Sequence, residues 1–234
     1  MPTLSFPPGQ AMGTLGWLGS ATGAAPVLAT GVVTIPDGAE ITLDVRVIES
    51  VRKTAAQDRA IHGTLSIQWQ LPDGSVVSQV REDSDDSWEI TGGSQAADLG
   101  FLRQLPADAI TALHLRAPIV AESFAAVTHL APGLRSLYLA WADLEDDALA
   151  HVSKLEGLIY LQTWGNRFTD RGVQQLAALT RLESLYLEEE PLSAAAFDFV
   201  VGLPHLARLG LQDVPLTDAE RADLRRRLPD VDVQ

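Results

Sequence analysis

The sequence predicts an α/β solenoid over residues 96–234, preceded by a small, mainly antiparallel β domain over residues 1–95. Two observations predict the solenoid, with a parallel sheet on its concave side and helices on its convex side. An apolar phrase recurs at a fixed period, and a second apolar series with helical spacing follows most copies of it. A third observation, alternation of apolar and polar residues between Gly/Pro turns, predicts the β domain.

The repeated phrase has the pattern L-x-x-L-x-L. Its copies start 24 residues apart, at residues 110, 134, 158, 182 and 206. The second series has spacings of three, as in Leu149, Val152 and Leu155, which is typical of one helix face. One such unit cannot bury its leucines alone, whereas stacked units form a continuous core.

The unit LIYLQTWGNRFTDRGVQQLAALTR joins the phrase to a Thr-Asp pair and a short helical pattern. In these features roughly residues 98–234 resemble the leucine-rich repeat family, in its 24-residue bacterial type. The resemblance implies a curved solenoid and says little about the partner. The asparagine that follows the strand in this type occurs only as Asn166, so no regular asparagine ladder is expected. Thr169, Ser193 and Thr217 are expected to cap the repeat helices.

The first 95 residues show alternation at residues 3–6, 41–47 and 64–69, separated by Pro- and Gly-containing turns. These patterns predict five to seven short strands, with one hairpin over residues 31–45. The expected boundary lies near residue 95, in a Gly-Gly-Ser-Gln run. The simplest role for this part is to cover the first apolar layer of the solenoid.

The concave surface carries the candidate binding residues. If the leucines turn inward, the third, fifth and seventh residues of each repeat face off the concave side, because strand residues alternate between faces. The eighth residue then lies at the lip. All three tyrosines and two of the five tryptophans occupy these places. The predicted partner-binding residues are Tyr138, Tyr160, Gln162, Trp164, Tyr186, Trp141, Glu188, Glu189, His114 and Arg116.

Tyrosine and tryptophan are enriched in interface hot spots, which favours a binding surface. We expect Tyr138, Tyr160, Trp164 and Tyr186 to act as anchors and Gln162 as the central hydrogen-bonding group. Glu188 and Glu189 would bind positively charged groups of the partner. Three alternatives stay open: strand propensity alone explains the tyrosines, Trp141 folds into the core, or the β domain packs over the rings.

Composition narrows the classes of partner. The chain has 234 residues, with Lys+Arg 17 and Asp+Glu 31 and a formal net charge of -14. This acidity argues against nucleic acid and anionic membranes and favours a basic protein or peptide. The absence of cysteine excludes disulfides and thiolate chemistry. The first residues lack the pattern of a secretory leader, so a cytoplasmic location is expected.

No catalytic pattern stands out. The five histidines show neither HxH nor HExxH spacing, and GxSxG, GxGxxG and the P-loop pattern are missing. We therefore predict no catalytic residue, no metal site and no cofactor. The acidic run at residues 82–86 does not begin an EF-hand loop. Counted from Asp83, the sixth place is Trp88 instead of Gly and the twelfth is Ser94 instead of Glu. The alternative is an enzyme or enzyme subunit with a site in the β domain, built from His62, Asp73 and this acidic run.

The sequence thus predicts a non-catalytic protein- or peptide-binding module with an aromatic, acid-bordered concave surface. An adaptor fits this prediction, and so does an immunity or inhibitor protein that neutralises a basic toxin or nuclease. A structural subunit of a larger assembly is a third possibility. The oligomeric state is not predicted.

Overall fold

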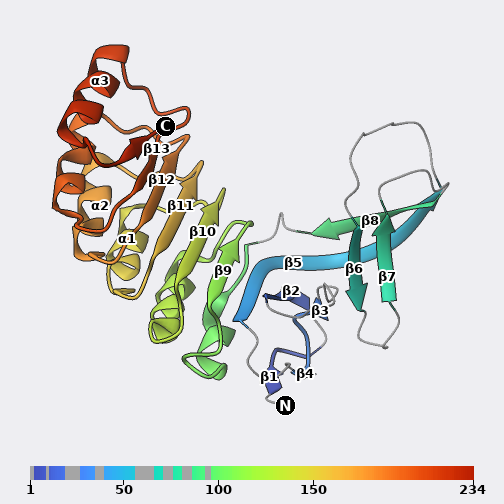
Figure 1. Cartoon of the computed structure of the whole chain (residues 1–234). Coiled ribbons are helices and arrows are strands. Elements are labelled where there is room, and N and C mark those ends of the chain that lie inside the picture. The colour runs from blue at the N-terminus through green and yellow to red at the C-terminus, as the bar shows by residue number, and fades with distance from the viewer. Residues whose placement is uncertain are drawn as a thin grey trace.

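A computed structural model describes residues 3–8, 11–18, 27–34, 40–55, 66–70, 76–80, 86–92 and 96–234. In its C-terminal half, short parallel strands follow one another at a regular interval along the chain. They are β9 (Ala112–Leu115), β10 (Ser136–Ala140), β11 (Tyr160–Trp164), β12 (Ser184–Glu188), β13 (Arg208–Gly210) and β14 (Asp232–Val233). Figure 1 shows β9 to β13 stacked side by side, with the helical segments along one side of the sheet.

The strand register is the direct test of the predicted repeat. Leu137 pairs with Leu161, and Leu161 pairs with Leu185, so neighbouring strands are offset by one 24-residue unit. The same offset relates β9 to β10 and β12 to β13. The predicted parallel sheet of a solenoid, with one strand in each 24-residue unit, is therefore confirmed.

The convex segments are short, and many are 3-10 rather than α-helical. The 3-10 helices are η1 (Leu99–Gln104), η2 (Ala121–Leu130), η3 (Gln174–Ala178) and η4 (Ala194–Gly202). The α-helices are α1 (Asp146–Val152), α2 (Asp170–Val173) and α3 (Asp218–Arg227). A 3-10 helix rises ~2.0 Å per residue against ~1.5 Å for an α-helix, so it spans the return path with fewer residues.

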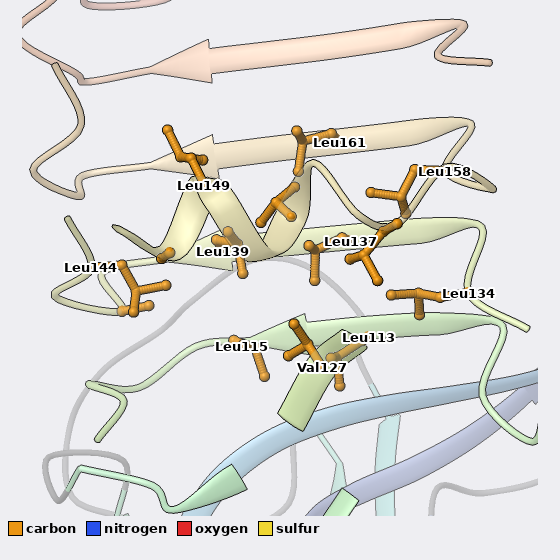
Figure 2. Packing of buried hydrophobic residues seen from close by; sticks show 14 of the residues in the cluster. Leu113, Leu115, Val127, Leu134, Leu137, Leu139, Leu144, Leu149, Leu158 and Leu161 are labelled. Atoms are coloured by element: carbon orange, nitrogen blue, oxygen red, sulfur yellow. The ribbon is translucent and has the colours of Figure 1, made fainter. Parts of the chain in front are cut away.

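The core lies between the sheet and the convex segments. Leu113, Leu137 and Leu161, from three successive strands, are fully buried and line up behind one another in Figure 2. Leu149 on α1 and Val127 on η2 pack against this row from the convex side. Burying one such side chain contributes about 1.5–3 kcal/mol, so the stacked rows supply the main driving force of the fold.

A polar ladder crosses the ends of two strands. The Asn166 side chain accepts from the Ala142 amide at 3.2 Å and donates to the Leu139 carbonyl at 3.1 Å. One repeat later, the Glu190 carboxylate accepts from the Asn166 amide at 3.2 Å and from the Phe168 amide at 3.4 Å. Glu190 thus provides the second step of a short mixed ladder, although its side chain is buried.

A second ladder joins the convex segments. The Asp146 carboxylate accepts from the Thr169 amide at 2.8 Å and from its hydroxyl at 2.6 Å, and Asp170 binds Ser193 in the same way. Thr169 and Ser193 do stand at the N-cap positions of α2 and η4, but the expected cap hydrogen bonds from their side chains are not formed. Their hydroxyls bond to the aspartate of the preceding repeat, which lies within reach. Thr217 does form a capping box with Glu220.

The N-terminal strands extend the same sheet. They are β2 (Ala11–Leu18), β3 (Val27–Leu28), β5 (Glu40–Ala55), β6 (Ser66–Gln70), β7 (Val76–Val80) and β8 (Asp86–Gly92). Within the described part of the chain the sheet order is β14-β13-β12-β11-β10-β9-β5-β2-β3-β6-β7, with β8 on β5. Leu43 of β5 pairs with Leu113 of β9 in parallel, and both are buried in one core. In Figure 1, β5 runs from the solenoid out to β6, β7 and β8.

The predicted hairpin over residues 31–45 is wrong. β4 (Val32–Thr34) pairs with β1 (Thr3–Ser5) in a separate antiparallel sheet, whereas β5 pairs with β2, β8 and β9. Both strands of that stretch exist, but each finds a partner far away in the sequence. The domain boundary near residue 95 stays a prediction, and residues 93–95 lie outside the described residues.

Candidate partner-binding surface

The strands place the predicted side chains on the face opposite the leucines. Leu137 and Leu139 are fully buried, while Tyr138 between them is half-buried on the other side. The register sets Tyr138 beside Gln162, and Gln162 beside Tyr186, in one row across β10, β11 and β12. We call Tyr138, Tyr160, Gln162, Trp164, Tyr186 and Glu188 the concave patch.

Two tyrosines of the concave patch stack on each other. The rings of Tyr160 and Tyr186 have centroids 5.6 Å apart and planes tilted by 36°. Tyr186 leans over Gly210, because a Cβ atom at Gly210 would lie 2.1 Å from its Cδ1. The missing side chain at Gly210 therefore gives the Tyr186 ring its place.

A chain of hydrogen bonds fixes the centre of the patch. The Tyr160 hydroxyl donates to Gln162 Oε1, and Gln162 Nε2 donates to Glu188 Oε2 at 2.6 Å. Burial, the neighbouring Tyr186 and the Glu188 carboxylate raise the pKa of Tyr160 to about 12. Tyr160 is therefore a neutral donor at physiological pH, and Gln162 already has partners on both sides.

The lip consists of Trp141, Gly165, Glu189 and Asp213, which follow β10 to β13 at equivalent places. All four have positive φ, of 47°, 62°, 52° and 57°. The rings of Trp141 and Trp164 have centroids 5.5 Å apart, and Trp164 Nε1 donates to Glu189 Oε2 at 2.5 Å. Trp141 is 56% exposed, so the alternative that placed it in the core is wrong.

The opposite flank carries a positive charge. The Arg116 guanidinium lies 5.1 Å from the centroid of the Tyr138 ring and 3.5 Å from the Asp44 carboxylate of β5. The rings of His114 and Tyr138 meet edge to face, with centroids 5.8 Å apart. Burial lowers the pKa of His114, although Asp44 opposes this effect. His114 is therefore predominantly neutral at pH 7 and adds little to the charge of this flank.

A cavity of about 390 Å³ adjoins the patch next to β12 and β13. It is lined by Glu188, Gly210, Leu211, Gln212, Arg221 and Gln234. The Arg221 guanidinium is held by the carbonyls of Leu211 and Val214 at 3.1 and 2.9 Å. The cavity therefore offers a carboxylate and an anchored guanidinium beside the tyrosines.

Among the described residues, no group of three or more acidic or histidine side chains is placed to hold a metal ion. Within the same residues, no helix is long and apolar enough to cross a membrane. The alternative catalytic candidates His62 and Asp73, and residues 82–85 of the acidic run, lie outside the described residues.

Sequence reasoning missed the roles of two residues, the buried Glu190 at the strand ends and Asp44 beside Arg116. Glu190 stands where the ladder asparagine is expected, and the fixed repeat period was the signal that could have assigned its role. Asp44 reaches Arg116 through the pairing of β5 with β9, which joins segments far apart in the chain. No local sequence pattern predicts that pairing.

Comparisons with known proteins add distant likenesses. No family model and no curated protein match the chain. It is similar to a leucine-rich repeat protein of Leptospira interrogans at 20% identity and a TM-score of 0.43, over 60% of this chain and 34% of that one. An internalin of Listeria monocytogenes matches at 19% identity and a TM-score of 0.45, over 60% and 37% of the two chains. Internalin C2 of the same organism matches at 20% and 0.40, over 61% and 67%.

The chain spans 34% and 37% of the lengths of the first two proteins. At this distance the similarity transfers neither a partner nor an activity. The strand register remains the basis for the solenoid, and membership of the bacterial 24-residue type stays a prediction.

Proposed function

We propose that this chain is a non-catalytic binding module whose concave patch and lip recognise a protein or peptide segment of basic character. One observation carries the proposal. Five aromatic side chains from three successive repeats gather on the concave face and its lip, where Trp141 contacts Trp164 and Tyr160 contacts Tyr186, while the alternating residues of the same strands form the core. Aromatic rings held in this way provide large contact area at a low entropic cost.

Charge supports the basic character of the partner. Glu188, Glu189 and Asp213 border the rings, and the whole chain carries a formal charge of -14. Complementary charge accelerates encounter and selects partners, and the effect weakens as salt screens it. We therefore expect association to slow markedly between low and physiological salt.

Preorganisation also supports the proposal. The side chains stand on sheet strands, and Gln162 and Trp164 are already oriented by hydrogen bonds to Glu188 and Glu189. Side chains that are ordered before binding lose less entropy when the complex forms. An adaptor and an inhibitor of a basic toxin or nuclease would both use such a surface, and the identity of the partner distinguishes them.

The test compares a Tyr138→Ala/Tyr186→Ala variant with Val201→Ala, which removes exposed apolar surface from the convex segment η4. Partners are captured from the native organism with wild type, purified, and measured for affinity against all three proteins. We expect the double variant to lose about 2 kcal/mol or more of binding free energy, and the control to bind like wild type. Wild-type affinity of a correctly folded double variant would refute the proposal.

A further inference from the structure

The lip holds an unusual exposed side chain. Trp141 is one of three large hydrophobic residues exposed in the described part of the chain, the others being Val32 and Val201. It does not stand alone. Its Cδ1 and the Glu189 Oε2 atom lie 2.5 and 3.3 Å from the point where a Cβ of Gly165 would be. Gly165 therefore leaves the space in which an indole ring and a carboxylate come together.

The backbone at the lip gives an independent reason to assign a role to these side chains. Positive φ favours glycine, because a Cβ atom meets the following carbonyl oxygen in this conformation. Gly165 meets this requirement, whereas Trp141 and Glu189 hold the same conformation with large side chains. Such backbone strain gathers at functional sites, where the side chain is needed in that place.

The chemistry of the cluster suits a planar cation. The face of an indole ring is the strongest aromatic acceptor of a cation, and a carboxylate beside it adds charge-assisted hydrogen bonds. One acceptor site of Glu189 is used by the Trp164 indole, and a carboxylate has about four such sites. On the other flank, the chain itself seats the Arg116 guanidinium over the Tyr138 ring.

We propose that Trp141, Trp164 and Glu189 form a subsite for one arginine side chain of the partner. The guanidinium lies over the exposed face of Trp141 and donates to Glu189. Arginine suits the subsite better than lysine, because its planar group stacks on a ring and presents parallel donors to a carboxylate. This assignment rests on the proposed function and names the chemistry that the lip reads.

The first experiment uses a small probe and leaves the unknown partner aside. N-acetylarginine amide is titrated into the full chain, and the five tryptophan indole N–H resonances are followed by NMR. Trp141→Phe and Trp164→Phe variants assign the signals of these two residues. We expect these two to shift and those of Trp17, Trp69 and Trp88 to stay unchanged. The neutral isostere N-acetylcitrulline amide is the matched control and should bind at least about fivefold more weakly.

The second experiment separates charge from shape. Glu189→Gln keeps the size of the side chain and removes its charge, so affinity for the arginine probe should fall at least about fivefold. Glu156→Gln removes one exposed negative charge outside the concave patch and the lip and should leave that affinity within about twofold. Equal loss in both variants, or equal binding of the arginine and citrulline probes, would overturn the subsite.

A third variant excludes simple damage to the fold. Trp141→Gly removes the ring and relieves the positive-φ strain, so it should abolish the shift of the Trp164 signal without lowering the thermal midpoint. A large loss of stability would show that Trp141 is a packing residue and would overturn the assignment. The outcome is distinguishable from failure of the proposed function, because the Tyr138→Ala/Tyr186→Ala test does not involve Trp141 or Trp164.

Discussion

The side chains on the two faces of the repeat strands differ in their burial and in their packing and hydrogen-bond partners. Behind the sheet, leucines pack on leucines one repeat away, and the buried Asn166 and Glu190 bond to backbone amides of the preceding repeat. On the concave face, Tyr160 bonds to Gln162, and Gln162 and Trp164 bond to acidic neighbours, while all three stay half-exposed. The inner-face side chains are therefore buried within the chain, whereas the concave-face side chains leave surface accessible to a partner.

This difference follows from the alternation of strand residues, which assigns neighbouring positions to opposite faces. Substitutions one residue apart should then act on different properties. Inner-face changes should lower the free energy of unfolding, and concave-face changes should lower affinity. We expect the largest change in stability in the leucine core and the smallest at the lip.

Leu161→Ala and Gln162→Ala test the contrast on one strand. Leu161 is fully buried in the centre of the core, so its truncation should cost about 3–4 kcal/mol through lost burial and the cavity left behind. Gln162→Ala removes two surface hydrogen bonds and should cost less than about 1 kcal/mol. Denaturant unfolding measures both, and comparable costs would contradict the assignment of faces.

Gly172→Ala tests the ladder that joins the convex segments. A Cβ atom at Gly172 would lie 2.0 Å from Asp146 Oδ1, so the carboxylate must leave Thr169. Although alanine usually stabilises a helix relative to glycine, we expect a net loss of about 1 kcal/mol here. The shift of the thermal unfolding midpoint, converted into a free energy of unfolding, measures this loss.

Gly202→Ala is the matched control, because nothing lies within 4 Å of its Cβ position. It should leave stability unchanged or slightly raised. In an Asp146→Gly background the cost of Gly172→Ala should disappear, since the carboxylate and the Cβ atom of Asp146, which would lie 2.0 and 3.0 Å from the new Cβ atom, are both gone. A cost that persists in that background would place its origin elsewhere.

Glu190 makes the ladder sensitive to pH. Burial raises the pKa of Glu190 above the ordinary 4.5, against the opposing bonds from the Asn166 and Phe168 amides. Between pH 4.5 and the raised pKa, Glu190 holds its proton more often in the folded state than in the unfolded state. Protonated Glu190 therefore stabilises the fold, an effect that is complete below pH 4.5 and is lost as pH rises through the folded pKa. Glu190→Gln should therefore cost more stability at pH 4.5 than at pH 7.5, measured by denaturant unfolding.

An opposite trend would mean that the two amides dominate and hold Glu190 ionised. His114 acts in the other direction, because its lowered pKa removes stability as pH falls below 6.5. The Glu190→Gln comparison with wild type cancels this contribution, since both proteins contain His114. The difference between the two unfolding curves therefore isolates the ladder carboxyl.

The repeat made the solenoid predictable, because each unit repeats the same local contacts and needs no distant information. The phase of the leucines likewise sufficed to place Tyr138 and Tyr186 off the core. The same reasoning failed where pairing is non-local, as for β4 with β1 in place of the predicted hairpin. It also failed for the hydroxyls of Thr169 and Ser193, because a local cap and an aspartate one repeat away compete for the same group.

The networks of the candidate site were beyond prediction for a related reason. The spacing places Gln162 among the rings but does not say that Tyr160 and Glu188 orient it. The positive φ of Trp141 and Glu189 could not be predicted either, because only one of the four lip positions is a glycine. A non-glycine residue gives no sign of this conformation in the sequence.

The smallest expected effect tests that backbone conformation directly. Asp213 has a φ of 57°, so Asp213→Gly relieves strain and should raise the free energy of unfolding by about 0.5 kcal/mol, after the greater freedom of glycine in the unfolded chain is subtracted. Asp213→Ala removes the same carboxylate and keeps a Cβ atom. The glycine variant should thus exceed the alanine variant by about 1 kcal/mol, because charge effects cancel between them. Equal stabilities would mean that the lip turn relaxes at no cost, and the strain attributed to Trp141 and Glu189 would lose its support.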